Sequence, residues 1–431
     1  MKIRLLLMPL ALVAAATAVL AGTPVSAKGP TSGTQVATGL SSPRGMAMGP
    51  DGMIYVAEAG PGGDTKITVD GAEYGNGLTG RISKIDPATG ARTTVVDKLP
   101  SQAQPTGDSV GPADVVFLGG KLYYLQTHGG AGYSFPDNPT GIYRVDGDGS
   151  IHLIADIGQF NLDDPIADVT NGGQADIEVG GNPYAMIVRD GAFLVVDGNQ
   201  NEVLRVTLDG DVTRIAEFVG HPVTTGIASQ ASGPLYVGGL GKFPFAPDEG
   251  LVFKVGYPTG NISEYAAGFS SVTDVEFGPG GQLYALTFAD QDVDFSSGSP
   301  FEPFTGKILK VNADGTMTPV VDGLTFATKL MFDGDTAYVS NNGVSIPGVF
   351  EGEIVKIENV SSLEPLAPAP APQPTTAPAP APTKSAGVIT APDTGTGTGT
   401  ATGGASLLWL FAALGLAGVV CTGAAVVAAK R

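Results

Sequence analysis

The stretch GLSSPRGMAMGPDGMIYVAEAG, residues 39–60, contains two short apolar segments joined by a Gly-Pro-Asp-Gly turn. A turn of this composition between two apolar runs predicts a β-hairpin. A similar phrase, SSVTDVEFGPGGQLYALTFAD, occupies residues 270–290, more than two hundred residues later. The recurrence of one supersecondary unit at such a distance indicates a repeat architecture.

The hairpin phrase occurs six times along the chain. After each copy comes a third strand with a basic residue near its middle, such as GRISKID at 80–86, and five copies then turn into a fourth strand. Four short antiparallel strands, repeated six times, predict an all-β fold, a six-bladed β-propeller whose blades bury their faces against one another. The six copies are GMAMGPDGMIYVAEA, ADVVFLGGKLYYLQT, YAMIVRDGAFLVVDG, GIASQASGPLYVGGL, TDVEFGPGGQLYALTFA and KLMFDGDTAYVSNN.

The sixth copy lacks a fourth strand, because a Pro-rich segment begins soon after Ile357. The missing strand is found near the other end of the chain, where TQVATGL at 34–40 resembles the fourth-strand phrases. We expect it to pair with residues 352–357 and close the ring, which removes exposed sheet edges. The alternative is a seventh, degenerate blade within residues 158–182, a stretch that is short and polar for four strands.

The N-terminal and C-terminal segments are not typical of a globular domain. Residues 1–27 carry basic residues, an apolar run and a small-residue cleavage pattern, which predicts a secretory signal peptide; an uncleaved anchor is the alternative. The propeller is then assigned to residues 33–360. Residues 361–404 are rich in Ala-Pro and Thr-Gly repeats and predict an extended linker without a core. Residues 405–431 predict a transmembrane helix with a cytoplasmic Lys-Arg tail.

The chain is strongly acidic, with 42 acidic against 23 basic residues and a net charge of −19. Such a charge disfavours binding to nucleic acid or to anionic lipid surfaces. It is explained either by solubility or by affinity for divalent cations. The single cysteine, Cys421, lies in the predicted membrane helix, so the exported body has no disulfide. We expect the body to be a monomer.

Long connections are predicted to gather on one face of the propeller. The links from second to third strand, and from fourth strand to the next blade, emerge at one end, while short hairpins emerge at the other. Since function on a rigid scaffold is usually carried by elaborated loops, we expect the ligand at this end. The insertions are residues 60–79, 100–110, 128–140, 158–182, 241–249, 290–305 and 342–351.

Polar side chains at the ends of the inner strands are predicted to surround the mouth of the central channel on this face. Five of them are candidate ligand-binding residues: Arg44, Asp114, Asp197, Asn199 and Asn341. Three more, Glu58, Asn182 and Asp274, are candidate ligands for Ca²⁺ or another divalent cation, because calcium takes six to eight oxygen ligands. The alternative is that Asp and Asn at strand ends satisfy the backbone groups of turns.

Other catalytic arrangements have little support in the sequence. The three histidines, His128, His152 and His221, are spread over separate segments, which argues against a histidine metal site. His128 and His221 fall in long loops, where either is a candidate lone acid or base. No G-x-S-x-G nucleophile motif is present.

Several phrases resemble one family of exported bacterial propellers. These are SPRGMAMGPDGMIYVAEAG, GPADVVF, GNPYAMIV with LVVDGNQNEVLRV, SVTDVEFGPGGQLYALTFA and, most specifically, PLYVGGLGKFPFAPDEGLVFKV. The family resembled is the ScyD/ScyE-like group, related to NHL and SMP-30-type propellers. The resemblance implies an exported six-bladed propeller of unassigned activity. In lactonases of the wider SMP-30 group, a Glu-Asn-Asp set holds a divalent cation, and Glu58, Asn182 and Asp274 are similar to it in type and position.

The C-terminus has a resemblance of its own. APDTG at 391–395, followed by an apolar span and a Lys-Arg tail, looks like a sortase cell-wall sorting signal. It departs from that signal by beginning with Ala instead of Leu and by a Thr-Gly spacer before the span. The sequence therefore leaves two outcomes open, a permanent membrane anchor at the bacterial cell surface and covalent attachment to the wall.

These observations favour a surface-anchored binding or scaffold propeller that recognises a small ligand, a glycan or a protein on its long-loop face, with a divalent cation as a candidate cofactor. The alternative is a metal-dependent hydrolase of the lactonase type, in which a neighbouring Asp acts as general base. A quinone-dependent sugar dehydrogenase is a third hypothesis, and it requires a catalytic His that the sequence does not reveal.

Overall fold

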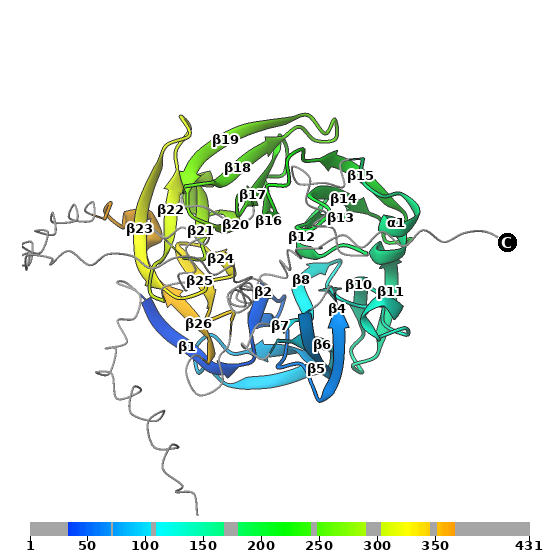
Figure 1. The fold of residues 1–431 in the computed structure, drawn as a ribbon. Helices are drawn as coiled ribbons and strands as arrows, with labels where there is room; N and C mark the ends of the chain where they lie inside the picture. Colours follow the sequence, from blue (N-terminus) through cyan, green and yellow to red (C-terminus); the bar gives the residue numbers. More distant parts are fainter. Residues whose placement is uncertain are drawn as a thin grey trace, which may run out of the picture.

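The computed structural model describes residues 33–69, 72–104, 109–167, 180–242, 248–289, 303–344 and 351–366. Six antiparallel β-sheets surround a central axis (Figure 1), so the predicted six-bladed β-propeller is confirmed. In the region proposed for a seventh blade, residues 157–163 form the short helix α1 (Ile157–Asp163), and residues 168–179 lie outside the described ranges.

The predicted N-terminal signal peptide, nearly all of the linker and the C-terminal span also lie outside these ranges. Among the described residues, no helix is both long enough and apolar enough to cross a membrane.

Each blade has a first strand at the axis and a fourth strand at the periphery. Blade 1 carries two additional strands, β4 and β7, beside its four. The strands are, in blade 1, β2 (Pro43–Met48), β3 (Ile54–Glu58), β4 (Thr65–Val69), β5 (Ala72–Ile85), β6 (Arg92–Ala103) and β7 (Ser109–Val110); in blade 2, β8 (Pro112–Leu118), β9 (Lys121–Gln126), β10 (Gly141–Val145) and β11 (Ile151–Asp156); in blade 3, β12 (Pro183–Arg189), β13 (Ala192–Asp197), β14 (Glu202–Val206) and β15 (Val212–Glu217); in blade 4, β16 (Thr224–Ser229), β17 (Leu235–Gly239), β18 (Gly250–Val255) and β19 (Ile262–Phe269); in blade 5, β20 (Val272–Phe277), β21 (Leu283–Thr287), β22 (Gly306–Val311) and β23 (Met317–Leu324); and in blade 6, β24 (Lys329–Asp333), β25 (Thr336–Asn341), β26 (Gly352–Ile357) and β1 (Gly33–Leu40).

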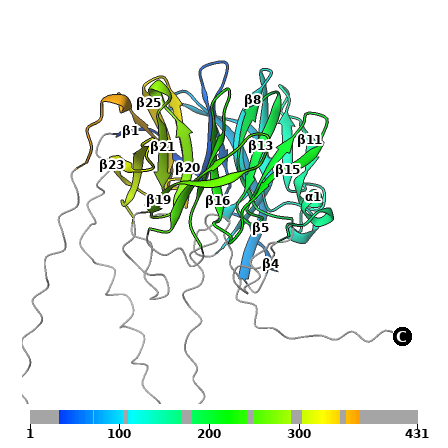
Figure 2. The same cartoon turned by 90° about the horizontal axis from the view of Figure 1, so that it is seen from above.

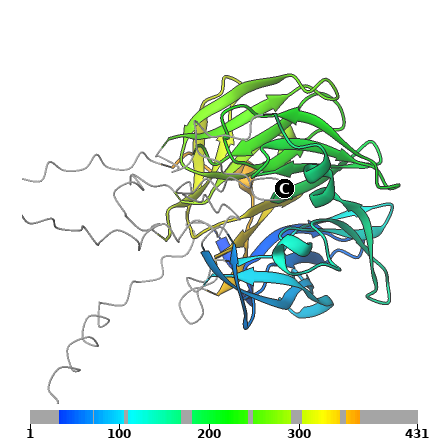
Figure 3. The same ribbon diagram turned by 45° about the vertical axis from the view of Figure 1, so that its right-hand side comes forward.

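The hydrophobic core lies between neighbouring blades. Figure 3 shows the twisted sheets packed face to face around the axis. Between blades 2 and 3, for example, Leu125 and Ile142 pack with Phe193 and Leu204, and all four are fully buried. Because both faces of a blade are covered in this way, the second strands read as continuous apolar runs, such as AFLVVD in β13.

The ring is closed by the N-terminal strand, as the sequence predicts. Strand β1 pairs antiparallel with β26, with Gly33 opposite Ile357 and Leu40 opposite Gly352. Leu40 and Ala37 are buried in the cluster that also contains Ile354. The two ends of the propeller sequence thus share the sheet of blade 6.

The two faces of the ring differ as the strand pattern predicts. In the side view, β4 and α1 lie at one end of the ring (Figure 2). Both belong to the connections that leave second or fourth strands. The opposite end carries short hairpins such as the one between β2 and β3, closed by a hydrogen bond from Gly49 N to Met53 O of 2.8 Å.

Candidate functional site

The first strands bring one equivalent residue from each blade to the centre of the ring. This residue, which is the third of the first strand in blades 1 to 5, is small in three blades, acidic in two and basic in one. The small residues make room for their charged neighbours: a Cβ on Gly45 would lie 1.8 Å from Asp114 Oδ1, and one on Gly226 would lie 2.5 Å from Asp274 Oδ1. In order of blades the six residues are Gly45, Asp114, Ala185, Gly226, Asp274 and Lys329. Only Asp114, Asp274 and Lys329 among them have charged side chains.

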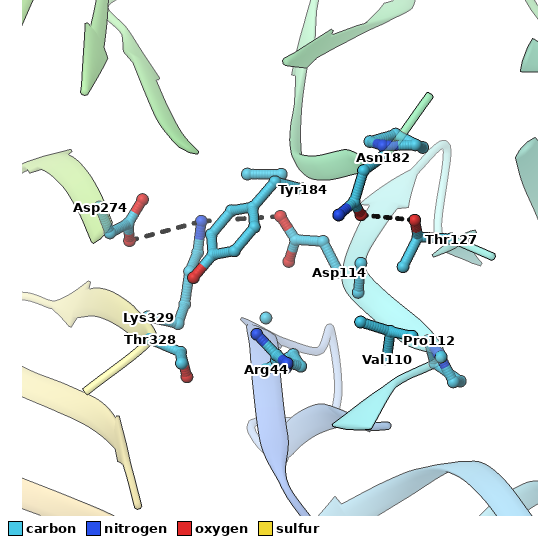
Figure 4. A pocket seen from close by; sticks show the side chains of 15 residues that line it. Arg44, Val110, Pro112, Asp114, Thr127, Asn182, Tyr184, Asp274, Thr328 and Lys329 are labelled. Atoms are coloured by element: carbon cyan, nitrogen blue, oxygen red, sulfur yellow. Dashed lines mark hydrogen bonds and ion pairs between the residues drawn. The ribbon is translucent and has the colours of Figure 1, made fainter. Parts of the chain in front are cut away.

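Lys329 joins the two carboxylates across the centre of the ring. Its Nζ lies 3.6 Å from Asp114 Oδ2 and 3.6 Å from Asp274 Oδ2 (Figure 4). Each Asp also links its blade to the next one, because Asp114 accepts a hydrogen bond from Met186 N and Asp274 accepts one from Leu330 N, both at 2.9 Å. We call these three side chains the ionic bridge.

Burial perturbs the protonation of this bridge. All three side chains are buried, and desolvation raises the pKa of Asp114 and that of Asp274, the latter to about 6, although Lys329 opposes both shifts. Burial alone would lower the pKa of Lys329, but Asp114, Asp274 and Glu276 together raise it. Lys329 therefore stays charged at neutral pH, while the carboxyl groups around it bind protons more readily than exposed ones.

The residue before each of these positions divides the ring into two halves. In blades 4 to 6 it is a threonine whose hydroxyl donates to the next blade: Thr225 to Val272 O, Thr273 to Ala327 O and Thr328 to Pro43 O, at 2.8 to 2.9 Å. In blades 1 and 3 the equivalent residues are Arg44 and Tyr184, which have larger side chains. The threonines thus fasten neighbouring blades to one another, while blades 1 and 3 place an arginine and a tyrosine beside the channel, where they join the charged side chains of the bridge.

These functional groups line one cavity at the long-loop end of the channel. It encloses about 390 Å³ of free space including its open mouth, and its closed part has room for about one water-sized group. The Tyr184 hydroxyl is buried, its pKa is raised to about 12 chiefly by that burial, and Arg44 partly opposes the shift. The polar residues that line the cavity are Arg44, Asp114, Thr127, Asn182, Tyr184, Asp274, Thr328 and Lys329.

Four of the eight residues predicted from the sequence meet in this cavity: Arg44, Asp114, Asn182 and Asp274. Asn182 Oδ1 accepts a hydrogen bond of 2.6 Å from the Thr127 hydroxyl. Arg44 donates to Ser109 O. The strand-end pattern therefore brings these four residues together at one cavity, and their role as a binding site stays a prediction.

The other four predicted residues are not among those lining the cavity. Glu58 is fully buried, and its carboxylate accepts hydrogen bonds from Arg81 (2.8 and 2.9 Å), from Ser83 and from the amide of Ser41.

Asp197 Oδ1 accepts bonds from the amides of Asn182, Asn199 and Gln200, at 2.8 to 3.0 Å. Asn341 binds the amide of Thr325 and the carboxylate of Glu353. These side chains therefore serve mainly as hydrogen-bond acceptors for backbone amides at turns and strand ends.

The candidate metal ligands Glu58, Asn182 and Asp274 do not share one set of contacts. Glu58 is paired with Arg81, and Asp274 with Lys329. Within the described ranges, no group of three or more His, Cys, Asp or Glu side chains is arranged to hold a metal ion. The positive charge beside Asp274 is supplied by a lysine of the chain itself. Calcium binding stays a prediction.

The long-loop histidine His128 has packing partners. Its ring stacks on that of Tyr133 with 4.4 Å between centroids, and Nδ1 lies 3.0 Å from Gln102 Oε1. His128 and Tyr133 are both buried. This arrangement fastens the loop after β9 to the extension of blade 1.

Sequence reasoning did not identify Lys329 or Tyr184. Both stand in the repeated phrase and are visible when the six first strands are placed in register. The third position then reads Gly, Asp, Ala, Gly, Asp, Lys. A lysine in a column that otherwise holds small residues and two acids indicates a charge partner for those acids.

The close approach of Gly45 to Asp114 leads to a prediction. A Cβ there would also lie 2.5 Å from the Cα of Asp114, so the backbone of β8 would have to move. We expect Gly45→Ala to lower the free energy of unfolding by about 1 to 3 kcal/mol, as overpacking does. Urea unfolding measures it. Gly132→Ala, which would meet no heavy atom within 4 Å, is the control; equal stability of the two variants would contradict the packing of this ring.

Comparison with known proteins places the chain by its fold only. No protein-family model matches it, and no curated protein matches its sequence. Similar solved structures include a gluconolactonase from Xanthomonas campestris, with 13% identity, a TM-score of 0.46 and coverage of 75% of this chain and 88% of that one.

A PQQ-bound aldose sugar dehydrogenase from Streptomyces coelicolor has 15% identity, a TM-score of 0.48 and coverage of 76% and 97%. A catalytically inactive virginiamycin B lyase from Staphylococcus aureus, crystallised with quinupristin, has 13% identity, a TM-score of 0.41 and coverage of 76% and 98%. At such identities the likeness concerns the propeller fold, which lactonases, lyases and sugar dehydrogenases share, and no activity follows from it.

Proposed function

We propose that the propeller is a binding module whose ligand enters the long-loop mouth of the channel. The observation that carries this proposal is the convergence of charged and polar side chains from blades 1, 2, 3, 5 and 6 on one concave site. Ligand sites typically combine such a concavity with a few convergent polar groups. The long connections of the same face supply the surface around it.

The ligand we propose is a hydroxylated small molecule or the end of a glycan. The closed part of the cavity takes only a water-sized group, so one hydroxyl enters while the remainder of the ligand lies against the loops. Two buried atoms are suited to it. Asp274 Oδ1 and the Tyr184 hydroxyl form no hydrogen bond of normal geometry within the described residues. A ligand hydroxyl can donate to the first and accept from the second.

The proposal is tested by titrating the purified protein with a panel of monosaccharides, monitored by saturation-transfer NMR and calorimetry. We expect Tyr184→Phe to weaken binding about five- to tenfold, the worth of one hydrogen bond. Tyr265 lies on β19, the outermost strand of blade 4, so Tyr265→Phe removes a hydroxyl away from the channel and should leave binding unchanged. Absence of binding by every sugar, or equal loss in both variants, would refute the proposed site.

A metal-dependent hydrolase of the lactonase type is the second candidate. It is favoured by one observation, the pKa of about 6 for Asp274, which suits a general base near neutral pH. Lactone opening is assayed with and without added Ca²⁺ or Zn²⁺, in the wild type and in Asp274→Asn. Metal-dependent turnover that this substitution abolishes would establish the hydrolase, whereas sugar binding without turnover favours the binding module.

The location of the module is also a proposal. The N-terminal signal, the linker and the apolar C-terminal segment support export and anchoring at the bacterial cell surface, with sortase processing at 391–395 as a variant of the same anchoring. The resemblance to the ScyD/ScyE-like group supports an exported propeller. In this arrangement a long linker holds the binding face away from the membrane.

A further inference from the structure

The central channel has a second chamber beyond the ionic bridge. It is lined by the later residues of the first strands, on the side of the short hairpins, and it contains about 750 Å³ of space including its open mouth. Asp114 and Lys329 line both this chamber and the cavity at the long-loop end. The bridge therefore forms the floor between two chambers that open on opposite faces. About 330 Å³ of it can hold water-sized groups, which is within the range of small-molecule pockets.

The wall of the second chamber is apolar and adaptable. It contains the methionines Met46, Met48, Met186 and Met331, together with Phe117 and Phe332. Methionine side chains adjust to irregular ligands, and aromatic rings attract cations to their faces. A wall of this composition suits a ligand with an apolar body, and it tolerates a positive charge on that ligand.

One acid interrupts this wall. At the fifth position of the first strands, blade 5 has Glu276 where the other blades have Ala47, Val116, Ile187, Ala228 and Met331. Glu276 Oε1 accepts a hydrogen bond of 2.9 Å from Phe277 N. Among the described residues no hydrogen bond or ion pair engages Oε2, and the side chain is only half-buried. A carboxylate oxygen thus remains accessible from the chamber.

The charge around Glu276 is unbalanced. Three carboxyl groups, those of Asp114, Asp274 and Glu276, surround the single ammonium of Lys329. Lys329 forms its ion pairs with the two aspartates. Desolvation raises the pKa of Glu276 to about 7, with Lys329 opposing and Asp274 adding to the shift. A proton or another cation relieves this excess of negative charge.

We propose that the short-hairpin chamber is a second binding site, and that it takes a small organic cation with an apolar body, such as a primary alkylammonium. The ammonium pairs with Glu276 Oε2, and the alkyl chain lies against the methionine and phenylalanine side chains. An anionic ligand fits less well, because the one cation at the floor is already shared between two carboxylates. The site is separate from the one proposed for the long-loop mouth.

The test is calorimetric titration of the purified protein with n-hexylammonium at about pH 8, where Glu276 is ionised. We expect saturable binding that Glu276→Gln weakens at least about tenfold, as loss of a charged hydrogen bond does. Glu264→Gln, an exposed acid on β19, makes the same change in net charge and should have no effect. n-Hexanol, which keeps the chain and lacks the charge, should bind much more weakly.

Two further measurements separate this site from the other chamber and from simple charge effects. Tyr184→Phe lies in the long-loop cavity and should leave hexylammonium binding intact, while Ala47→Phe should fill the second chamber and abolish binding with every charge retained. Binding should weaken on going below about pH 7, as Glu276 is protonated, and protonation of Asp274 acts in the same direction. Absence of binding, equal binding of hexanol, or unchanged binding by Glu276→Gln would each overturn the proposal.

Discussion

Replacement of Lys329 by methionine should lower the free energy of unfolding by about 3 to 5 kcal/mol at neutral pH, the usual effect of removing one member of a buried ion pair. The methionine preserves most of the side-chain volume, so cavity formation contributes little. What is lost is the charge that lies 3.6 Å from both Asp114 and Asp274. The two aspartates would remain buried without a counter-ion.

The loss should grow as the pH rises. The pKa of Asp274 is raised from the usual 3.8 to about 6, so its protonated form contributes stability below about pH 4 that is lost as the pH rises through 6. The pKa of Glu276 is raised from the usual 4.5 to about 7, so its protonated form also contributes stability at low pH that is lost as the pH rises through 7. Without Lys329 the attraction that opposes both shifts is lost. We therefore expect the variant to be closest to wild type at about pH 4 to 5 and furthest from it at about pH 8.

Urea unfolding of wild type and variant across this pH range measures the effect. Lys254→Met, which removes an exposed lysine from β18, is the matched control and should change little. Asp274→Asn in the Lys329→Met background should restore part of the stability, because an amide oxygen can still accept from Leu330 N. A pH-independent loss, or no rescue, would show that the ionic bridge does not govern the centre of the ring.

The fold could be predicted from the sequence because the same hairpin phrase is repeated six times. Each copy alone is an ambiguous pair of apolar runs, but their common order of turn residues restricts the answer to blades around an axis. The closing strand was predictable for the same reason, since residues 34–40 match a phrase that the last copy lacks. The extra strands β4 and β7 were not predicted, because they lie in two separate insertions, 60–79 and 100–110, that are particular to blade 1.

The site could be predicted only in part, because strand-end residues serve two purposes. Arg44, Asp114, Asn182 and Asp274 belong to first strands or lie immediately before one, and these strands line the channel. Glu58, Asp197 and Asn341 end second strands, where their side chains turn toward backbone amides and a neighbouring arginine. Residue type is the same in both groups. The difference lies in the position within the blade, which only an alignment of the repeats makes visible.

The second large effect is expected from removing the closing strand. Deletion of residues 33–40 should lower the free energy of unfolding by on the order of 5 kcal/mol, from the lost burial of Leu40 and Ala37 and the lost ladder hydrogen bonds to β26. That is a large part of the total stability of most domains. It would also expose the edge of β26, which is a template for pairing with other chains.

Thermal unfolding and size-exclusion chromatography measure both consequences, and deletion of the eight residues PQPTTAPA at 372–379, in the predicted linker, is the control of equal length. We expect the strand deletion to unfold at a lower temperature and to form oligomers, and the linker deletion to resemble wild type. An effect of this size requires that β1 is what closes the outer edge of the ring. In the described residues, the contacts that join blades 6 and 1 at the axis, such as the bond from Thr328 to Pro43 O, lie between first strands and leave the outer edge of blade 6 unpaired. A strand deletion that stayed monomeric and kept the wild-type unfolding temperature would show that these inner contacts are sufficient.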